Sequence, residues 1–332
     1  MNNALVYLVF SETVLPDDEW KQIEQDLIFN LPETTSRGTN GRFLLPGKVL
    51  EIHASIQAST ASGDFTTLAE CTRFNHHNPR VEAVQQKHHV QTILQPAGLY
   101  SLHRKSGLAV FDMDSTLIQQ EVIDELARAV GLYDQVAAIT EAAMRGEAPY
   151  TDFETSLRAR VALLKGVETS IWETLKEGTI TFTPGAKELV RYLKKLGWKT
   201  AVLSGGFTPL ANWVKETLGL DYAYANHLVS DDEKGVLTGE LVREAPIIHA
   251  EKKRELLRQL AAENDIPLER TIAVGDGSND LLMMHAAGMG LAFNAKPKVQ
   301  QAAPTRLNTA SLLNTMHVLG FTEDEVRELS SA

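Results

Sequence analysis

The chain has 332 residues, of which 43% are apolar and 23% charged, and its formal net charge is −11. This composition suits one large globular domain or two smaller ones, and the acidic balance argues against a surface for nucleic acid or anionic membrane. Cys71 is the only cysteine, which excludes an intramolecular disulfide and agrees with a cytoplasmic location. The first apolar run ends at Phe10 and is too short for a secretion signal or a membrane span.

The first part of the chain predicts a small α+β domain over residues 1–82. Residues 4–10 and 43–57 have strand-like patterns, and a helical pattern lies between them in DDEWKQIEQDLIFNL. This order resembles an ACT-like or ferredoxin-like module. The domain contains no ligand motif, so three roles stay open for it: binding a small molecule, joining two copies in a homodimer, or packing against the rest of the chain.

The next segment, residues 83–106, is predicted to be a linker, because the sequence from about His76 onward becomes polar and irregular. Two histidine pairs, His76-His77 and His88-His89, lie in this polar stretch. Histidine is a common metal ligand, but these pairs have no carboxylate partners nearby. We therefore interpret them as solvated side chains.

Residues 107–332 predict an α/β domain. Short apolar runs alternate here with helical patterns; the runs are LAVF at 108–111, TAVL at 200–203, TIAV at 271–274 and GMGLAF at 288–293. Strands separated by helices are typical of a parallel sheet with helices on both faces. Residues 119–182, between the first two strands, read as mostly helical.

Polar residues follow three of these predicted strands. LAVF is followed by Asp112 and Asp114, TAVL by Ser204-Gly205-Gly206, and TIAV by the acidic loop GDGSND at 275–280. Ligands of open parallel sheets bind beyond the carboxyl ends of the strands, so we expect these three segments to converge on one site. Clustered carboxylates need a cation to stay ionised together, and hard oxygen ligands suit Mg²⁺.

The two closely spaced aspartates suit two different chemical roles. Asp112 has the character of a nucleophile, because an aspartate can form an acyl-phosphate intermediate that divides a difficult displacement into two easier ones. Asp114 can then protonate the leaving alcohol and later take a proton from water. A dehalogenase is a poorer interpretation, since no leaving alcohol would need the proton of Asp114.

The combination of DMDST, VLSGG, a helix with Lys-Lys and GDGSND resembles the haloacid dehalogenase superfamily, and specifically its phosphoserine phosphatase branch. The resemblance extends from Leu108 to about Asn308. It implies a Rossmann-like parallel sheet with a helical cap at about 119–182, which would exclude water from the phosphoryl chemistry. It also implies Mg²⁺-dependent hydrolysis of O-phospho-L-serine, the final step of serine biosynthesis.

The resemblance further implies a role for each matching residue. The implied roles are Asp112 as nucleophile, Asp114 as general acid and base, Ser204, Gly205 and Asn279 as phosphate contacts, and Asp112, Asp114, Asp276 and Asp280 around the metal. The phosphate-binding lysine is Lys252 or Lys253, and the distance from the GDGSND loop favours Lys253.

The predicted cap carries residues suited to the two ends of an amino acid. By the same resemblance, Glu121 meets the substrate ammonium and Arg160 its carboxylate, with Met144 and Phe153 as apolar lining. A surface ion pair between Glu121 and Arg160 is the alternative interpretation. Two rival functions also stay open: a phosphatase for another small phosphate ester, and a non-catalytic regulator that binds metal and phosphate.

Overall fold

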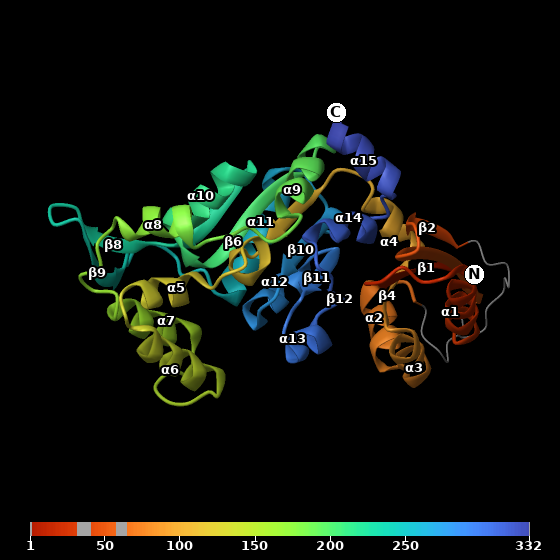
Figure 1. The fold of residues 1–332 in the computed structure, drawn as a ribbon, viewed down its shortest axis with the longest axis horizontal. Coiled ribbons are helices and arrows are strands. Elements are labelled where there is room, and N and C mark those ends of the chain that lie inside the picture. Colours follow the sequence, from red (N-terminus) through yellow and green to blue (C-terminus); the bar gives the residue numbers. More distant parts are fainter. Residues whose placement is uncertain (1, 32–40, 58–64, 332) are drawn as a thin grey trace.

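The computed structural model describes residues 2–31, 41–57 and 65–331, and Figure 1 shows a small N-terminal unit beside a larger α/β unit. The N-terminal elements are β1 (Asn2–Ser11), α1 (Asp17–Phe29), β2 (Arg42–Leu45), β3 (Val49–Gln57), α2 (Leu68–His77), α3 (Pro79–His88) and β4 (Val90–Pro96). They form an antiparallel sheet in the order β2-β3-β1-β4. This is the ferredoxin-like order, with the second helix divided in two.

The expectation that residues 83–106 form a linker is wrong. They contain the end of α3, the whole of β4 and a further helix, α4 (Ala97–Leu102). Strand β4 pairs with β1 along its full length and is buried on both faces, with Leu94 packed toward the helices and Ile93 in the core shared with the α/β unit. Polar residues among these apolar ones, such as Gln91, give the strand its loop-like sequence.

The solvated interpretation of the histidine pairs is also wrong for His88. This side chain is buried at the end of α3, and its Nδ1 lies 2.9 Å from Glu19 Oε1. Burial and the positive charge of Arg306 lower the pKa of the half-buried His76 to about 4. His77 and His89 are exposed.

The α/β unit is built on a parallel sheet, as predicted, and the sheet has six strands. Its strands lie in the order β12-β11-β10-β5-β6-β7. The predicted strands correspond to β5 (Leu108–Phe111), β6 (Lys199–Phe207), β10 (Thr271–Gly275) and β11 (Met289–Phe293), while β7 (Tyr222–Asn226) and β12 (Thr305–Leu307) were not identified from the sequence.

Helices cover both faces of this sheet, which confirms the predicted fold class. Phe111 of β5 belongs to the core with α9 (Ala186–Lys195), α10 (Thr208–Leu218) and α14 (Thr315–Val318). Its neighbour Val110 points to the opposite face, where α11 (Ala250–Glu263), α12 (Leu281–Ala286) and α13 (Pro297–Ala302) pack. Alternate residues of a strand point to opposite faces, so continuous apolar runs such as LAVF are required here.

A helical subdomain follows β5 and lies over the carboxyl end of the sheet. It consists of α5 (Val122–Ala129), α6 (Tyr133–Met144), α7 (Phe153–Ala162) and α8 (Ile171–Gly178), within the range expected for the cap. A hairpin of β8 (Leu228–Asp231) and β9 (Val236–Leu241) is joined to it through backbone hydrogen bonds, one from Gly166 N–H to the Leu237 carbonyl (2.8 Å) and one from Leu237 N–H to Val167 (2.8 Å).

The N-terminal sheet packs directly on the α/β unit. Leu8 and Ile93 belong to the same apolar core as Met316 of α14 and Phe321, which precedes α15 (Glu323–Ser331). The Gln91 side chain adds two hydrogen bonds to the Asn308 backbone, at 2.7 and 2.9 Å. Among the described helices, none is both long and apolar enough to cross a membrane.

Candidate active site

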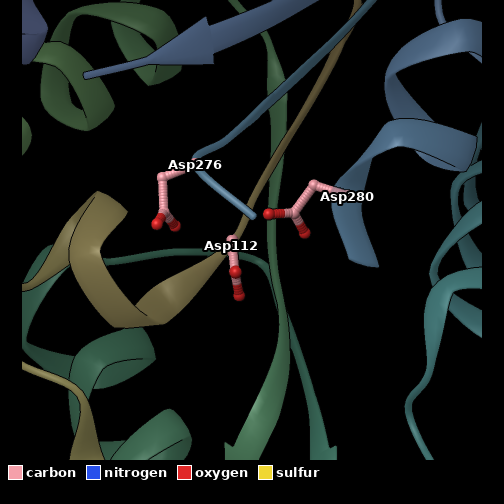
Figure 2. Close-up of side chains that lie close together, drawn as sticks. All are labelled: Asp112, Asp276 and Asp280. Carbon is pink, nitrogen blue, oxygen red and sulfur yellow. The ribbon is translucent and has the colours of Figure 1, made fainter. Parts of the chain in front are cut away.

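The carboxyl ends of two neighbouring strands, β5 and β10, bring the predicted acidic residues together. Asp112 follows β5, while Asp276 and Asp280 come from the loop after β10, which pairs with β5 in parallel. One carboxylate oxygen from each of the three lies within 4.8 Å of the others, and Figure 2 shows the three side chains side by side. The predicted convergence of these strand ends is therefore observed.

Asp112 is held rigidly at the end of its strand. It is 5% exposed, and its N–H continues the strand pairing by donating to the Val274 carbonyl (2.9 Å). Its Oδ1 accepts a hydrogen bond from Met113 N–H (2.7 Å) and lies 2.8 Å from Lys253 Nζ. With Oδ1 engaged twice, Oδ2 is the oxygen left to react with a ligand.

Lys253, in the first turn of α11, is the lysine that reaches the site. It is fully buried, and its ammonium lies between Asp112 Oδ1 (2.8 Å) and Asp280 Oδ1 (2.7 Å). Burial alone would lower the lysine pKa, but the two carboxylates outweigh that effect and raise it, so the ammonium stays charged. Lys252 lies on the outer side of the helix and pairs with Glu255 (3.2 Å).

The acidic cluster has more negative charge than Lys253 can balance. Burial and repulsion from Asp112 raise the pKa of Asp276 to about 7, and burial with the same repulsion also raises the pKa of Asp280. Carboxylate oxygens at this spacing are the donors that hard divalent cations prefer. The donor set therefore fits a metal ion, and the carboxylate of Asp114 is not part of it.

Asp114 lies between the start of the cap at Val122 and the glycine loop at the end of β6. Burial, together with the nearby charges of Glu121 and Asp112, raises the Asp114 pKa well above its usual value, which favours the protonated form of this carboxyl group. Val122 N–H approaches its Oδ1 at 3.4 Å. A Cβ on Gly206 would lie 3.0 Å from Asp114 Oδ2, so a side chain at 206 would crowd Asp114 in this position.

The loop at the end of β6 supplies a buried hydroxyl. Ser204 is fully buried, and its Oγ accepts a hydrogen bond from Gly206 N–H (2.8 Å). The Gly205 carbonyl accepts one from the side chain of Asn226 (2.8 Å). Asn226 was missed because it belongs to no motif; its place at the carboxyl end of an unrecognised strand, β7, was the available signal.

Phe153 of the cap and Asn279 of the loop after β10 lie against this glycine loop. A Cβ on Gly205 would lie 3.3 Å from the Phe153 ring and 3.8 Å from the Asn279 amide nitrogen. Glu121 accepts a hydrogen bond from Ser115 Oγ (2.8 Å), and burial raises the Glu121 pKa. A glycine at 205 therefore lets the cap close down on the sheet.

Arg160 and Glu121 do not form the ion pair considered as the alternative: among the described residues, no contact within 4.0 Å joins them. The guanidinium instead donates to the Ser156 carbonyl (3.3 Å) and to Thr140 Oγ1 (3.5 Å). Burial lowers the arginine pKa, and the negative charges of Asp124 and Glu121 oppose that effect. The two side chains are close enough for the charge of Glu121 to affect the Arg160 pKa, but they do not form an ion pair, so both charges remain available to a ligand.

Met144 is the predicted site residue that the structure does not bring to the others. It is the last residue of α6, and its side chain is 66% exposed. The neighbouring Arg145 pairs with Glu147 (2.5 Å) at the surface of the cap. In this arrangement Met144 lines no part of the buried site.

Comparison with known proteins agrees with this geometry. Residues 109–285 match the model of the haloacid dehalogenase-like hydrolases. A probable phosphoserine phosphatase of Schizosaccharomyces pombe is 48% identical over 225 residues, 68% of this chain and 74% of the relative. The phosphoserine phosphatase of Saccharomyces cerevisiae is 38% identical over 313 residues, 94% of each chain.

A solved structure described as a phospho-aspartyl intermediate analogue of phosphoserine phosphatase is also similar. It is 42% identical, with a TM-score of 0.58, and the match covers 64% of this chain and 98% of that one. The family model covers the strand ends and the cap that form the site described above. The chain therefore belongs to the haloacid dehalogenase-like hydrolase family, in the branch of the phosphoserine phosphatases.

Proposed function

We propose that this protein hydrolyses O-phospho-L-serine to L-serine and phosphate, the final step of serine biosynthesis, through a phosphorylated Asp112. The observation that carries the proposal is the buried Asp112, paired with Lys253, below a cap whose Glu121 and Arg160 do not pair with each other. The phosphoserine phosphatase relatives support the same substrate.

The cap residues provide the specificity for an amino acid. Arg160 donates through its Nε and Nη1 in long hydrogen bonds of 3.3 and 3.5 Å, so most of its N–H groups remain available to a substrate carboxylate. Glu121 offers a carboxylate to the substrate ammonium. Phe153 covers the glycine loop and would exclude water while the phosphoryl group reacts.

In the first step, Oδ2 of Asp112 attacks phosphorus while the bond from phosphorus to the serine oxygen breaks. Asp114 gives its proton to that oxygen, so serine leaves as a neutral alcohol. The Lys253 ammonium and the Ser204 hydroxyl stabilise the charge on the phosphoryl oxygens. Gly205 and Asn279 complete the proposed phosphate contacts.

In the second step, a water molecule attacks the phosphorus of phosphorylated Asp112. Asp114, now a carboxylate, takes a proton from that water, and the acyl-phosphate bond breaks. Phosphate leaves, and both aspartates return to their starting forms. One carboxyl group with a raised pKa thus serves as acid and then as base.

The acidic cluster would hold the Mg²⁺ that the proposal includes. Asp112, Asp276 and Asp280 supply carboxylate oxygens, and we expect Asp114 to contribute its backbone carbonyl. When bound, Mg²⁺ neutralises the clustered charges and orients the phosphoryl oxygens. Without a cation, an incoming phosphate dianion would face the repulsion that already raises the pKa of Asp276.

The expectations about location and assembly stay predictions. The N-terminal unit contributes none of the groups proposed for the reaction, so a homodimer formed through it would leave the chemistry of each copy intact. A cytoplasmic location fits a small metabolite substrate and a chain with one buried cysteine, Cys71.

Phosphate release from a panel of phosphorylated amino acids and sugar phosphates, with and without Mg²⁺, tests the proposal. We expect the highest kcat/KM on O-phospho-L-serine and loss of turnover when a chelator removes the metal. Equal kcat/KM across the panel would contradict the substrate assignment. Unchanged turnover after chelation would contradict the metal assignment separately.

A further inference from the structure

Asn226 connects two segments of the active site that lie far apart in the sequence. It is fully buried, its Nδ2 donates to the Gly205 carbonyl (2.8 Å), and its Oδ1 accepts from Ile248 N–H (2.9 Å). Only this orientation of the amide satisfies both partners. Ile248 lies two residues before the first residue of α11, the helix that carries Lys253.

The peptide unit between Gly205 and Gly206 is held at both ends. Asn226 binds its carbonyl, and its N–H donates to Ser204 Oγ (2.8 Å). Because Ser204 Oγ accepts this hydrogen bond, its own hydrogen must find another acceptor. Within the described part of the chain Ser204 Oγ donates no hydrogen bond, so its hydrogen is available to a ligand.

The glycine loop cannot fix this orientation by itself. A side chain at Gly205 would crowd the Phe153 ring, and one at Gly206 would crowd Asp114, so glycine suits both positions. Glycine gives the backbone more freedom than any other residue. A partner outside the loop is therefore needed to hold the peptide unit, and Asn226 is in the position to do so.

We propose that Asn226 is a positioning residue for phosphoryl transfer. By fixing the Gly205–Gly206 peptide unit, it turns the Ser204 hydroxyl hydrogen toward the phosphoryl oxygens. This inference rests on the proposed phosphatase function, because the phosphoryl group is the ligand that Ser204 would meet. Asn226 acts through Ser204 and does not touch the substrate itself.

A double-mutant cycle tests this dependence. We expect Asn226→Ala to lower kcat on p-nitrophenyl phosphate roughly tenfold to a hundredfold, with a smaller change in KM. The reason is that a Ser204 hydroxyl pointing away from the phosphoryl oxygens no longer stabilises the charge that develops in the transition state. In a Ser204→Ala background the same substitution should cost at most about threefold. Equal losses in the two backgrounds, or an Asn226→Ala protein with full activity, would overturn the proposal.

Two further variants separate positioning from folding. Asn226→Asp keeps the shape of the side chain and the acceptor for Ile248 N–H but loses the donor to the Gly205 carbonyl. Its loss of kcat should likewise be large in the wild-type background and small in the Ser204→Ala background, and this can be measured even if Asn226→Ala does not fold. Asn75 is a matched control: it is also buried, and its amide makes two hydrogen bonds to Thr92, at 2.8 Å each, in the N-terminal sheet. Asn75→Ala should lower the melting temperature and leave kcat unchanged. A fall in kcat for Asn75→Ala equal to that for Asn226→Ala would overturn the positioning role.

The choice of substrate keeps this test separate from the proposed specificity. The p-nitrophenyl ester has neither the ammonium nor the carboxylate that Glu121 and Arg160 are proposed to bind. A wild-type protein that hydrolyses this ester but not phosphoserine would contradict the proposed substrate, while the cycle would still decide the role of Asn226.

Discussion

Replacing Lys253 by methionine should affect both stability and catalysis, because the change removes a charge and keeps the length of the side chain. The buried ammonium makes two charge-assisted contacts, 2.8 Å to Asp112 and 2.7 Å to Asp280. Removing one partner of a buried ionic network costs about 3 to 5 kcal/mol, since the remaining charges lose their compensation. Protonation of Asp280, whose pKa is already raised, relieves part of this cost. We therefore expect a loss on the order of 3 kcal/mol in the free energy of unfolding.

Catalysis should suffer as well as stability in the Lys253→Met protein. The ammonium is proposed to face the charge that develops on the phosphoryl oxygens, and losing one such group costs about a hundredfold to a thousandfold in kcat. Urea unfolding at neutral pH gives the stability, and steady-state kinetics on phosphoserine give kcat/KM. The matched control is Lys252→Met, which removes one exposed ion pair with Glu255 and should change the free energy of unfolding by less than about 1 kcal/mol. Equal effects of the two substitutions would refute the assignment of Lys253.

Three more predictions test other parts of the molecule. Arg160→Ala should lose on the order of 2 to 4 kcal/mol of transition-state binding to phosphoserine, roughly thirtyfold to a thousandfold in kcat/KM, and far less on p-nitrophenyl phosphate; equal losses on both esters would assign Arg160 to the folding of the cap. Glu51 is buried, which raises its pKa, but hydrogen bonds from His53, Arg42 and Tyr100 outweigh burial and lower the pKa to about 2 from 4.5. Its contribution to stability is therefore complete above pH 4.5 and is lost as the pH falls toward 2. Between these pH values the unfolding free energy, measured in urea, should fall by on the order of 3 kcal/mol less in Glu51→Gln than in the wild type. An equal fall in the two proteins would contradict this. A chain that begins at His103 should keep its metal-dependent kcat but melt at a lower temperature, because the apolar core shared with the N-terminal sheet becomes exposed; a folded truncation inactive on every ester would show that this sheet completes the site.

The catalytic edge of the sheet could be predicted from the sequence because its signals are local. Short apolar runs mark β5, β6 and β10, and each runs directly into residues with obvious chemistry, such as Asp112 and Ser204. Parallel strands end at the same edge, so convergence follows from topology without knowledge of any side-chain contact. The choice between Lys252 and Lys253 depended on which side of α11 faces the sheet, and the complete burial of Lys253 beside Asp112 favours Lys253.

The features that the sequence did not reveal depend on contacts between distant segments. Strand β4 was taken for a linker because Gln91 looks like a loop residue until its partner, the Asn308 backbone, is known. Asn226 has no motif, and its importance comes from hydrogen bonds to residues about twenty positions away on either side. Met144 followed from the resemblance alone, and its exposed position at the end of α6 does not support that role.

The most direct test of the account is whether Asp112 becomes phosphorylated during turnover. The wild-type protein is mixed with phosphoserine and Mg²⁺, quenched in acid within the first turnovers, and the peptide containing DMDST is analysed by mass spectrometry. We predict one phosphoryl group on Asp112, and neither a phosphoryl group nor turnover in a folded Asp112→Asn protein. Substantial turnover by Asp112→Asn, or a phosphoryl group on a different residue, would contradict the account.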